Sequence, residues 1–303
     1  MIVTKFGGSS ISNKGFEVIK KEIEKNKKLI IVLSALSSTT SKLIKFTESY
    51  KIEIIDDIIE NHKLFINNLG LKDDCINNLF KELLCLSNLL ILDYDNKNLK
   101  SNIIGFGEYL SSEILHNYLD EKYFLCDARN IIKTDSVHNA IFMTNQFYCD
   151  SKIIKNIIDN NDVIIVQGFN ASTSDNKHCI LSRGGSDTSA ALIANAVNAE
   201  KLFIFSDVSG VYEADPRLIT DAKLIENLDY TITKEITAIG AKVLHPYCIA
   251  PCEEKNIPII IKNTYDDNKI NTIINNNKND NYKLLIKKDS NTFFKISSIN
   301  MWN

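Results

Sequence analysis

Six short clusters in the sequence combine glycines with hydroxyl and charged side chains, a mixture suited to binding phosphate and carboxylate groups. The first is KFGGSS, residues 5–10, which directly follows an apolar run. Glycine amides at such a turn can point toward a phosphate, and the Lys5 ammonium can reach the same oxygens. The segment is not a Walker A loop, because the spacing G-x-x-x-x-G-K-[ST] is absent. A tight strand-to-helix turn with a surface lysine is the alternative interpretation.

The second and third clusters are SALSSTT, residues 34–40, and GFGEYLSS, residues 105–112. The hydroxyls and amides of SALSSTT could hold phosphate or carboxylate oxygens, although such stretches are more often helix N-caps. A dinucleotide fingerprint is excluded for the other cluster, because Leu110 occupies the last position of G-x-G-x-x-G. Glu108 is either a surface carboxylate at the start of a helix or a clamp for a substrate ammonium group.

The fourth cluster, SRGGSDTSAA, spans residues 182–191 and contains one of only three arginines in the chain, Arg129, Arg183 and Arg217. Lysine is used freely elsewhere, so a retained arginine favours a role that needs its planar, bidentate fork. At a glycine-rich turn, that fork suits a substrate carboxylate. Asp187 or Ser186 could simply cap the following helix. Capping alone does not explain Arg183.

The last two clusters are SDVSGVYEADPR, residues 206–217, and GAKVLHP, residues 240–246. In the former, Asp207 and Ser206 could bind a ribose, Tyr212 could pack on a base, and Arg217 could meet phosphates. The alternative is a plain turn at Asp-Pro-Arg. In the latter, Lys242 could be a second phosphate-binding cation. His245 precedes a proline and is predicted to be a structural cap rather than a catalyst.

The clusters need a scaffold, and apolar runs that alternate with helical spacing supply one. Strands are predicted over residues 2–6, 29–33, 123–127, 162–168, 201–206 and 257–262. Helices are predicted over residues 16–27, 108–119, 187–198 and 234–247, with two or three more between 43 and 92. This order predicts an α/β fold with an open, mostly parallel sheet covered on both faces. Ligands bind at the carboxyl ends of such strands, where most of the clusters lie.

The composition excludes several classes of protein. A net charge of −3 over 303 residues gives no reason to expect a nucleic-acid partner. The seven cysteines are odd in number and form no C-x-x-C pair, which argues against a disulfide framework or a zinc site. The longest apolar runs are strand-sized and too short to span a membrane. No signal peptide is recognisable at the start, so a cytoplasmic protein is expected.

Taken together and in this order, the six clusters resemble the aspartokinase branch of the amino-acid-kinase family. The matching phrases are KFGGSS, SALSSTT, GFGEYLSSEIL, SRGGSD, SDVSGVYEADPR and GAKVLHP, which extend over residues 1–265. KFGG together with GE-x-L-S and RGGSD points to this branch rather than to relatives that act on acetylglutamate, glutamate, carbamate or UMP. Two small departures are Ser9, where threonine is usual, and Ser182, where glycine is usual.

The resemblance implies a three-layer open sandwich of the amino-acid-kinase type, with an N-terminal lobe for aspartate and a C-terminal lobe for ATP. It implies that Arg183 pairs with the α-carboxylate of aspartate and Glu108 with its ammonium. The other residues implied around the acceptor are Thr40, Gly184, Gly185 and Ser186. The residues implied around ATP are Lys5, Gly7, Gly8, Ser9, Ser206, Asp207, Tyr212, Arg217, Lys242 and Val243. The implied catalytic set is Lys5, Lys242 and Asp187.

The reaction implied by the resemblance is transfer of the ATP γ-phosphoryl group to the side-chain carboxylate of L-aspartate, giving 4-phospho-L-aspartate. That acceptor carboxylate titrates near pH ~4, so it is already an ionised nucleophile and needs no general base. Lys5, Lys242, Mg²⁺ and the glycine amides would offset its repulsion from the γ-phosphate. Asp187 would orient Lys5. No protein ligand for Mg²⁺ is predicted.

Two other functional hypotheses stay open at this stage. A related kinase acting on another carboxylate would keep the ATP half, but Glu108 and Arg183 suit a free amino acid. A non-catalytic nucleotide-binding remnant is the hypothesis of a different class. Against it, the candidate catalytic and binding side chains are all present in the sequence.

Residues 266–303 are predicted to be a linker followed by part of a regulatory region. Residues 266–280 are rich in asparagine and lysine, and 282–287 and 292–297 suggest two short strands. In the family, regulatory ACT domains usually follow the kinase, and residues 294–301 resemble the first strand of one. Feedback sensing of lysine or threonine is therefore expected to be absent. A homodimer is possible, but the sequence does not decide the oligomeric state, because dimers in the family are often built through ACT domains.

Overall fold

The computed structural model describes residues 1–72, 74–134, 147–182, 184–239, 244–266 and 271–277, together with the backbone of residues 283–288 and 292–297. Its centre is an eight-stranded sheet in the order β10-β12-β11-β9-β1-β2-β6-β3. Neighbouring strands in this sheet are parallel except β11 and β12, so the predicted mostly parallel sheet is confirmed. The strands are β1 (Ile2–Phe6), β2 (Leu29–Leu33), β3 (Phe124–Cys126), β6 (Val163–Gln167), β9 (Lys201–Ser206), β10 (Asn227–Asp229), β11 (Ile259–Asn263) and β12 (Thr272–Asn275).

The inner strands are covered on both faces, which explains their unbroken apolar sequences. β2 reads LIIVL and β6 reads VIIVQ, and every residue of both strands is buried. Parallel strands in this position need apolar side chains on both faces instead of an alternating pattern. β1 lies between β2 and β9, with Lys5 opposite Val32 and Ile204. A lysine in this central strand is an exception that calls for a partner.

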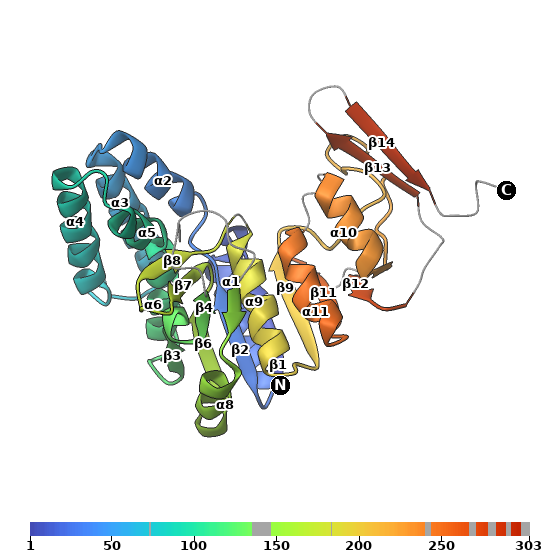
Figure 1. The fold of residues 1–303 in the computed structure, drawn as a ribbon, viewed down its shortest axis with the longest axis horizontal. Helices are drawn as coiled ribbons and strands as arrows, with labels where there is room; N and C mark the ends of the chain where they lie inside the picture. Colours follow the sequence, from blue (N-terminus) through green and yellow to red (C-terminus); the bar gives the residue numbers. More distant parts are fainter. Residues whose placement is uncertain are drawn as a thin grey trace.

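Helices cover both faces of the main sheet, so the domain has three layers (Figure 1). The covering helices are α1 (Asn13–Lys25), α6 (Phe106–Tyr118), α8 (Ser151–Asn160), α9 (Gly185–Ala196) and α11 (Ile249–Glu254). The face that carries Val3 and Ile204 packs against α8, α9 and α11. The opposite face carries Phe6 and Phe205, whose rings stack with centroids 4.4 Å apart, and packs against α1 and α6.

A helical lobe extends from the α6 side of the sheet (Figure 1). Its helices are α2 (Thr39–Ser49), α3 (Glu53–Asn68), α4 (Asn77–Leu92) and α5 (Lys97–Ile104). The two or three helices predicted between residues 43 and 92 are thus confirmed, whereas α5 is an addition. Only Gly105 separates α5 from α6, so this turn determines where Glu108 lies. Within the part of the chain that the structure describes, no helix combines the length and apolar character needed to cross a bilayer.

A second, four-stranded sheet in the order β5-β4-β7-β8 precedes α9 along the chain. Its strands are β4 (Ile132–Thr134), β5 (Phe147–Cys149), β7 (Asn170–Thr173) and β8 (His178–Ile180), with α7 (Ala128–Ile131) just before β4. These elements and α8 are not predicted from the sequence. For the strands the reason is their length, since runs of three or four residues give almost no periodic signal. β7 and β8 form an antiparallel hairpin that connects β6 to α9.

The C-terminal part departs from prediction at two points. The sequence predicts one helix over residues 234–247, but α10 is Tyr230–Ile239, and a separate turn, η2 (Pro246–Cys248), leads into α11. His245 between them is extended, as expected for a residue before proline. The predicted linker over residues 266–280 is wrong where β12 joins the main sheet between β10 and β11. β13 (Lys283–Lys288) and β14 (Thr292–Ser297) form the hairpin that the two predicted short strands suggest.

Candidate active site

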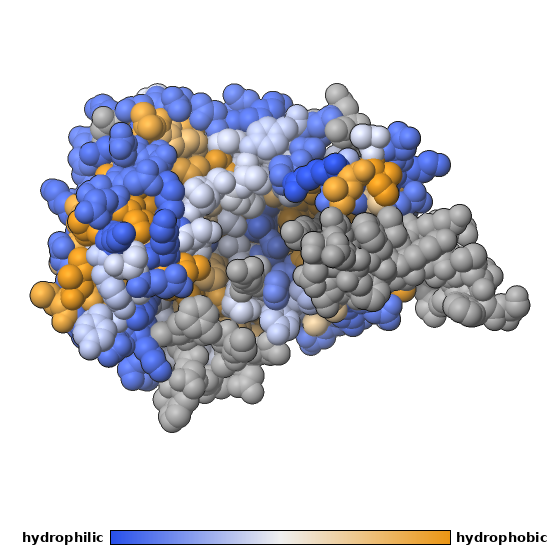
Figure 2. Space-filling view, turned by 90° about the horizontal axis from the view of Figure 1, so that it is seen from above, coloured by the Kyte–Doolittle hydropathy of each residue, from blue (hydrophilic) through white to orange (hydrophobic). Residues whose placement is uncertain are grey.

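Lys5 and Asp187 form a buried ion pair at the carboxyl end of the main sheet. Lys5 lies near the end of β1, and Asp187 lies in the first turn of α9. Lys5 Nζ and Asp187 Oδ1 are 2.6 Å apart, and the two side chains are 10% and 15% exposed. Seen from the side toward which β1 runs, the surface is hollowed near its middle, with hydrophilic residues in the depth of the hollow (Figure 2). The short distance between Lys5 Nζ and Asp187 Oδ1 shows that the expected contact between these two residues is present.

Glu108 is a second buried charged residue in the same cluster. It lies in the first turn of α6 and is 3% exposed, so the interpretation as a surface carboxylate is wrong. Burial raises the pKa of Glu108 to about 8, against opposing effects of the Ala35 amide and the Lys5 ammonium. Its Oε2 atom has no hydrogen-bond partner among the described residues. A buried carboxyl oxygen without a partner is costly, so this one is suited to receive a cationic ligand group.

Close backbone contacts bring the first two loops against α6. A Cβ atom on Gly8 would lie 2.8 Å from the carbonyl oxygen of Ala35, and one on Gly107 would lie 2.7 Å from Ala35 Cβ. The backbone N–H of Leu36 donates to Ser111 Oγ at 2.9 Å. Larger residues at either glycine would push these segments apart. The loop after β2 is thus clamped between the loop after β1 and the start of α6.

Gly7 and Thr40 lie in these same two segments. The Gly7 N–H donates to the carbonyl of Phe205 at 3.1 Å, and a Cβ atom on Gly7 would lie 3.4 Å from Lys5 Nζ. This contact joins the loop after β1 to the end of β9. Thr40 is half-buried in the first turn of α2, directly after the clamped loop. Both residues therefore lie on the elements that frame Lys5 and Glu108.

The turn into α9 depends on two glycines. Gly184 has a φ of +71°, a conformation that strains other residues, and a Cβ atom there would lie 2.2 Å from His245 Cβ. A Cβ atom on Gly185 would lie 2.5 Å from the ring of Phe169. Ser186 follows and is 8% exposed. These close contacts fix the start of the helix that carries Asp187.

His245 lies nearer to the site than the sequence suggests. It caps η2 by accepting the backbone N–H of Tyr247, which agrees with the predicted structural role. Burial lowers the pKa of His245, whereas the nearby Asp187 carboxylate raises it. The proximity of His245 to Gly184 and Asp187 had no signal in the sequence, because it arises only when η2 packs against α9.

The residues expected around the nucleotide gather at the end of β9. Asp207 Oδ1 accepts hydrogen bonds from Ser206 Oγ at 3.1 Å and from Ser9 Oγ at 3.5 Å. Tyr212 is half-buried and forms an isolated β-bridge with Leu224. The structure thus brings Ser9, Ser206 and Asp207 together across two loops.

Arg217 is exposed and lies in a turn in which its backbone N–H donates to Asp215 Oδ1 at 2.9 Å. This agrees with the plain-turn interpretation of Asp-Pro-Arg and leaves the guanidinium open to solvent. Three other predicted site residues, Arg183, Lys242 and Val243, lie outside the described residues. Among those that are described, no group of three or more His, Cys, Asp or Glu side chains could hold a metal ion.

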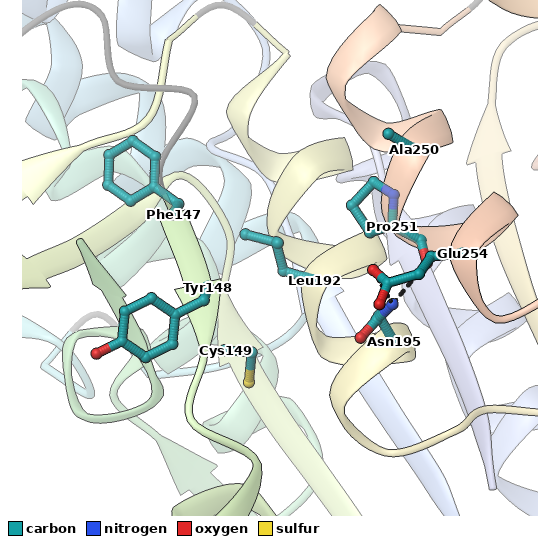
Figure 3. A pocket seen from close by; sticks show the side chains of 8 residues that line it. All are labelled: Phe147, Tyr148, Cys149, Leu192, Asn195, Ala250, Pro251 and Glu254. Carbon is teal, nitrogen blue, oxygen red and sulfur yellow. Dashed lines mark hydrogen bonds between the residues drawn. The ribbon is translucent and has the colours of Figure 1, made fainter. Parts of the chain in front are cut away.

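A separate pocket of about 310 Å³ lies between β5, α9 and α11 (Figure 3). It is lined by Phe147, Tyr148, Cys149, Leu192, Asn195, Ala250, Pro251 and Glu254. In this pocket, Asn195 Nδ2 donates to Glu254 Oε2 at 3.2 Å. The lining contains no lysine or arginine that could bind a phosphate and none of the predicted site residues. The nucleotide is therefore not expected here.

Comparison with known proteins agrees with this fold. The profile of the amino acid kinase family matches residues 1–263. The chain is 32% identical over 302 residues to a bifunctional aspartokinase/homoserine dehydrogenase of Buchnera aphidicola subsp. Acyrthosiphon pisum, an alignment that covers 90% of this chain and 36% of that protein. It is 29% identical to an aspartokinase of Rickettsia felis, with 90% and 60% of the two chains covered.

Among solved structures, E. coli aspartokinase III in complex with aspartate and ADP superposes with a TM-score of 0.82. This superposition covers 94% of this chain and 67% of that chain at 24% identity, which shows a shared fold. Because the family profile spans most of its length, the chain belongs to the amino acid kinase family. It spans 36% and 60% of the length of the two curated relatives named above.

Proposed function

We propose that the chain is an aspartate kinase, a phosphotransferase that uses ATP to phosphorylate the side-chain carboxylate of L-aspartate. The observation that carries the proposal is the buried cluster of Lys5, Asp187 and Glu108, in which a carboxyl oxygen of Glu108 lacks a partner among the described residues. The names of the two curated relatives and the ligands of the E. coli structure support the same activity.

Recognition of the acceptor would rest on Glu108. When ionised, its Oε2 atom can accept a hydrogen bond from the ammonium group of a free amino acid. An N-acetylated amino acid lacks that ammonium and would leave the carboxyl group unpaired in a buried site, at a cost of about 1–3 kcal/mol. This difference favours aspartate or glutamate over acetylglutamate. Arg183 is proposed to bind the α-carboxylate.

The phosphoryl transfer itself needs positioning and charge compensation. A side-chain carboxylate oxygen of aspartate attacks the γ-phosphorus, the bond from that phosphorus to the β–γ bridging oxygen breaks, and ADP leaves. No proton moves in this step, because the nucleophile is already ionised. Lys5 would offset the negative charge that the two reactants bring together. Asp187 holds the Lys5 ammonium 2.6 Å away, so the cation is fixed before the substrates arrive.

Mg²⁺ fits this arrangement as an ion that accompanies the nucleotide. Magnesium is usually bound by one or two carboxylates together with substrate phosphates, so a protein-built cluster of ligands is not required. Asp207, with the Ser9 and Ser206 hydroxyls beside it, is one carboxylate that could contact the ion on the proposed nucleotide side. When bound, the ion would neutralise phosphate charge.

Acceptor-dependent release of ADP tests the proposal. The purified chain would be incubated with MgATP and aspartate, glutamate, acetylglutamate or no acceptor, and an acyl phosphate product would be trapped with hydroxylamine. Turnover with aspartate that yields a hydroxamate is the expected result. Lysine and threonine are added in parallel to test whether either one inhibits the turnover.

The two alternative functions correspond to other outcomes of this assay. Turnover with glutamate or acetylglutamate, but not aspartate, would replace the proposal with a related amino acid kinase. Binding of ATP without any acceptor-dependent turnover would favour a non-catalytic nucleotide-binding protein.

A further inference from the structure

A buried polar bridge joins the turn before Glu108 to the turn after β6. Asn170 is 0% exposed, and its Nδ2 donates to the carbonyl oxygens of Gly105 at 3.0 Å and Gly168 at 3.2 Å. Its Oδ1 accepts from His178 Nε2 at 2.7 Å. The bridge therefore connects three segments: the α5–α6 turn, the end of β6 and strand β8.

The chemistry of the partners fixes the orientation of both side chains. Carbonyl oxygens only accept, so the Asn170 amide must present its NH₂ group to Gly105 and Gly168. Its Oδ1 then faces His178, which must carry a proton on Nε2. Burial lowers the pKa of His178 to about 3, so the imidazole stays neutral and keeps this one proton. His178 thus acts as a single, defined donor.

Each end of the bridge contacts a segment next to a residue of the candidate active site. Gly105 is the cap residue between α5 and α6, so its carbonyl lies about one helical turn before Glu108. A Cβ atom on Gly105 would lie 2.1 Å from Asn170 Oδ1, which shows how closely the two segments approach. At the other end, a Cβ atom on Gly168 would lie 2.6 Å from Ser186 Cβ, in the first turn of α9.

We propose that Asn170 and His178 are positioning residues for the acceptor site. The bridge sets the distance between Glu108 on α6 and the start of α9, where Asp187 holds Lys5. Loss of one bond leaves buried polar atoms unpaired, so the bridge works as a unit. The inference rests on the proposed function, because it assigns the bridge to aspartate binding.

Kinetics of four variants test the functional part of this inference. Asn170→Ala and His178→Phe should each raise the KM for aspartate about tenfold, as expected from losing about one buried hydrogen bond, with the KM for ATP unchanged within about twofold. His178→Gln, whose amide can supply the same N–H donor, should behave like the wild type. Asn195→Ala is the matched control, because Asn195 Nδ2 also donates to a backbone carbonyl, that of Pro251 at 2.8 Å, away from the bridge.

Amide hydrogen exchange tests the bridge without relying on catalysis. Exchange in a peptide covering residues 101–112 should accelerate in Asn170→Ala and His178→Phe, but not in His178→Gln or Asn195→Ala. Unchanged exchange would show that the bridge does not restrain the turn between α5 and α6. Faster exchange with an unchanged KM for aspartate would show that the bridge stabilises the turn. It would refute a role of the bridge in positioning the substrate. A His178→Gln variant as impaired as His178→Phe would refute the donor role of His178.

These outcomes are distinguishable from failure of the proposed function. A wild-type protein without aspartate-dependent turnover would refute that function, whatever the variants do. The exchange measurement would then decide independently whether the bridge holds α6 in place.

Discussion

The two sides of the candidate active site differ in how firmly their residues are held. On the proposed acceptor side, Glu108 is 3% exposed and Asn170 bridges the adjacent turns, and Lys5 next to this side is 8% exposed. On the proposed nucleotide side, residues 207–226 contain no helix and no strand beyond the isolated bridge of Tyr212. Arg217 in that segment is exposed.

This contrast suggests that the two substrates are bound in different ways, one by a preformed site and the other by an adaptable segment. A small amino acid offers few groups to hold it, so its site must be formed in advance. A nucleotide offers a base, a ribose and phosphates, and can be bound by a segment that adapts. Water can replace contacts at the exposed segment but not at the buried cluster. Substitutions should therefore have effects that decrease from the acceptor side to the nucleotide side.

The largest effect is expected for Lys5→Ala. Removing a fixed cation from the reacting phosphate should lower kcat about 10²–10³-fold, as for other groups that stabilise transition-state charge. Steady-state kinetics with both substrates varied would measure it, with circular dichroism to verify folding. Lys234→Ala is the matched control, because Lys234 forms an ion pair of 2.7 Å with Glu253 but is 40% exposed. A normal kcat with only a raised KM for aspartate would contradict this assignment of Lys5.

Glu108→Gln should have the next largest effect. The variant keeps the shape of the side chain but loses the charge that would pair with the ammonium, so the KM for aspartate should rise about 10–100-fold. The KM for ATP should change little. Glu113→Gln, on the same helix α6 and only half-buried, is the control. Equal changes in both Michaelis constants would remove Glu108 from the acceptor subsite.

The pH dependence of aspartate binding sharpens the same comparison. Because burial raises the pKa of Glu108 to about 8, the empty site holds a neutral carboxyl group at pH 7. Binding the ammonium requires ionisation, so the KM for aspartate should fall about tenfold per pH unit from pH ~6 and level off above about 8. The KM for ATP serves as the internal reference. Glu108→Gln should abolish this dependence, and a slope that persists in the variant would assign it to another group.

The same raised pKa makes the free energy of unfolding depend on pH. Below about 4.5 the Glu108 carboxyl group is protonated in both the folded and unfolded states. As the pH rises toward about 8, only the unfolded chain ionises, so stability is lost over this range. Glu108→Gln should therefore gain stability relative to the wild type as pH increases, as thermal unfolding at several pH values would measure.

The smallest effect is expected for Arg217→Ala. An exposed charge pair contributes about 0.2–1 kcal/mol, so the KM for ATP should rise by less than about fivefold. The effect should shrink further as salt is added, because exposed charges are screened. A loss as large as that of Lys5→Ala would show that the segment closes over the nucleotide and excludes water, which would remove the contrast between the two sides.

The main sheet could be predicted from sequence because its inner strands are apolar and buried. β2 and β9 have their predicted bounds, and β1 begins and ends as expected. β12 could not be predicted, because the asparagines and lysines that flank it are typical of a linker. The helix predicted over residues 234–247 extends too far, because α10 ends at Ile239 and His245 is extended, as the residue before a proline usually is.

The site was predictable in its residue types but not in its burial or its supports. The pairing of Lys5 with Asp187 was expected from the family resemblance, and the ion pair of 2.6 Å is present in the structure. That Glu108 is buried depends on how α5 and α6 meet at Gly105, which is tertiary information. Asn170 and His178 had no signal, since an isolated asparagine and histidine in a short hairpin match no motif. The roles of Arg183, Lys242 and Val243 stay predictions.

The position of β1 has a consequence for the order in which the molecule is made. β1 is the first strand of the chain, yet it pairs on one side with β2 and on the other with β9, whose register places Ile2 opposite Lys201. At about 5–20 residues per second, a ribosome would need about 10–40 s to make the chain between them. Lys5 is thus synthesised well before Asp187 and β9. The reactive centre can assemble only after most of the family domain has left the ribosome.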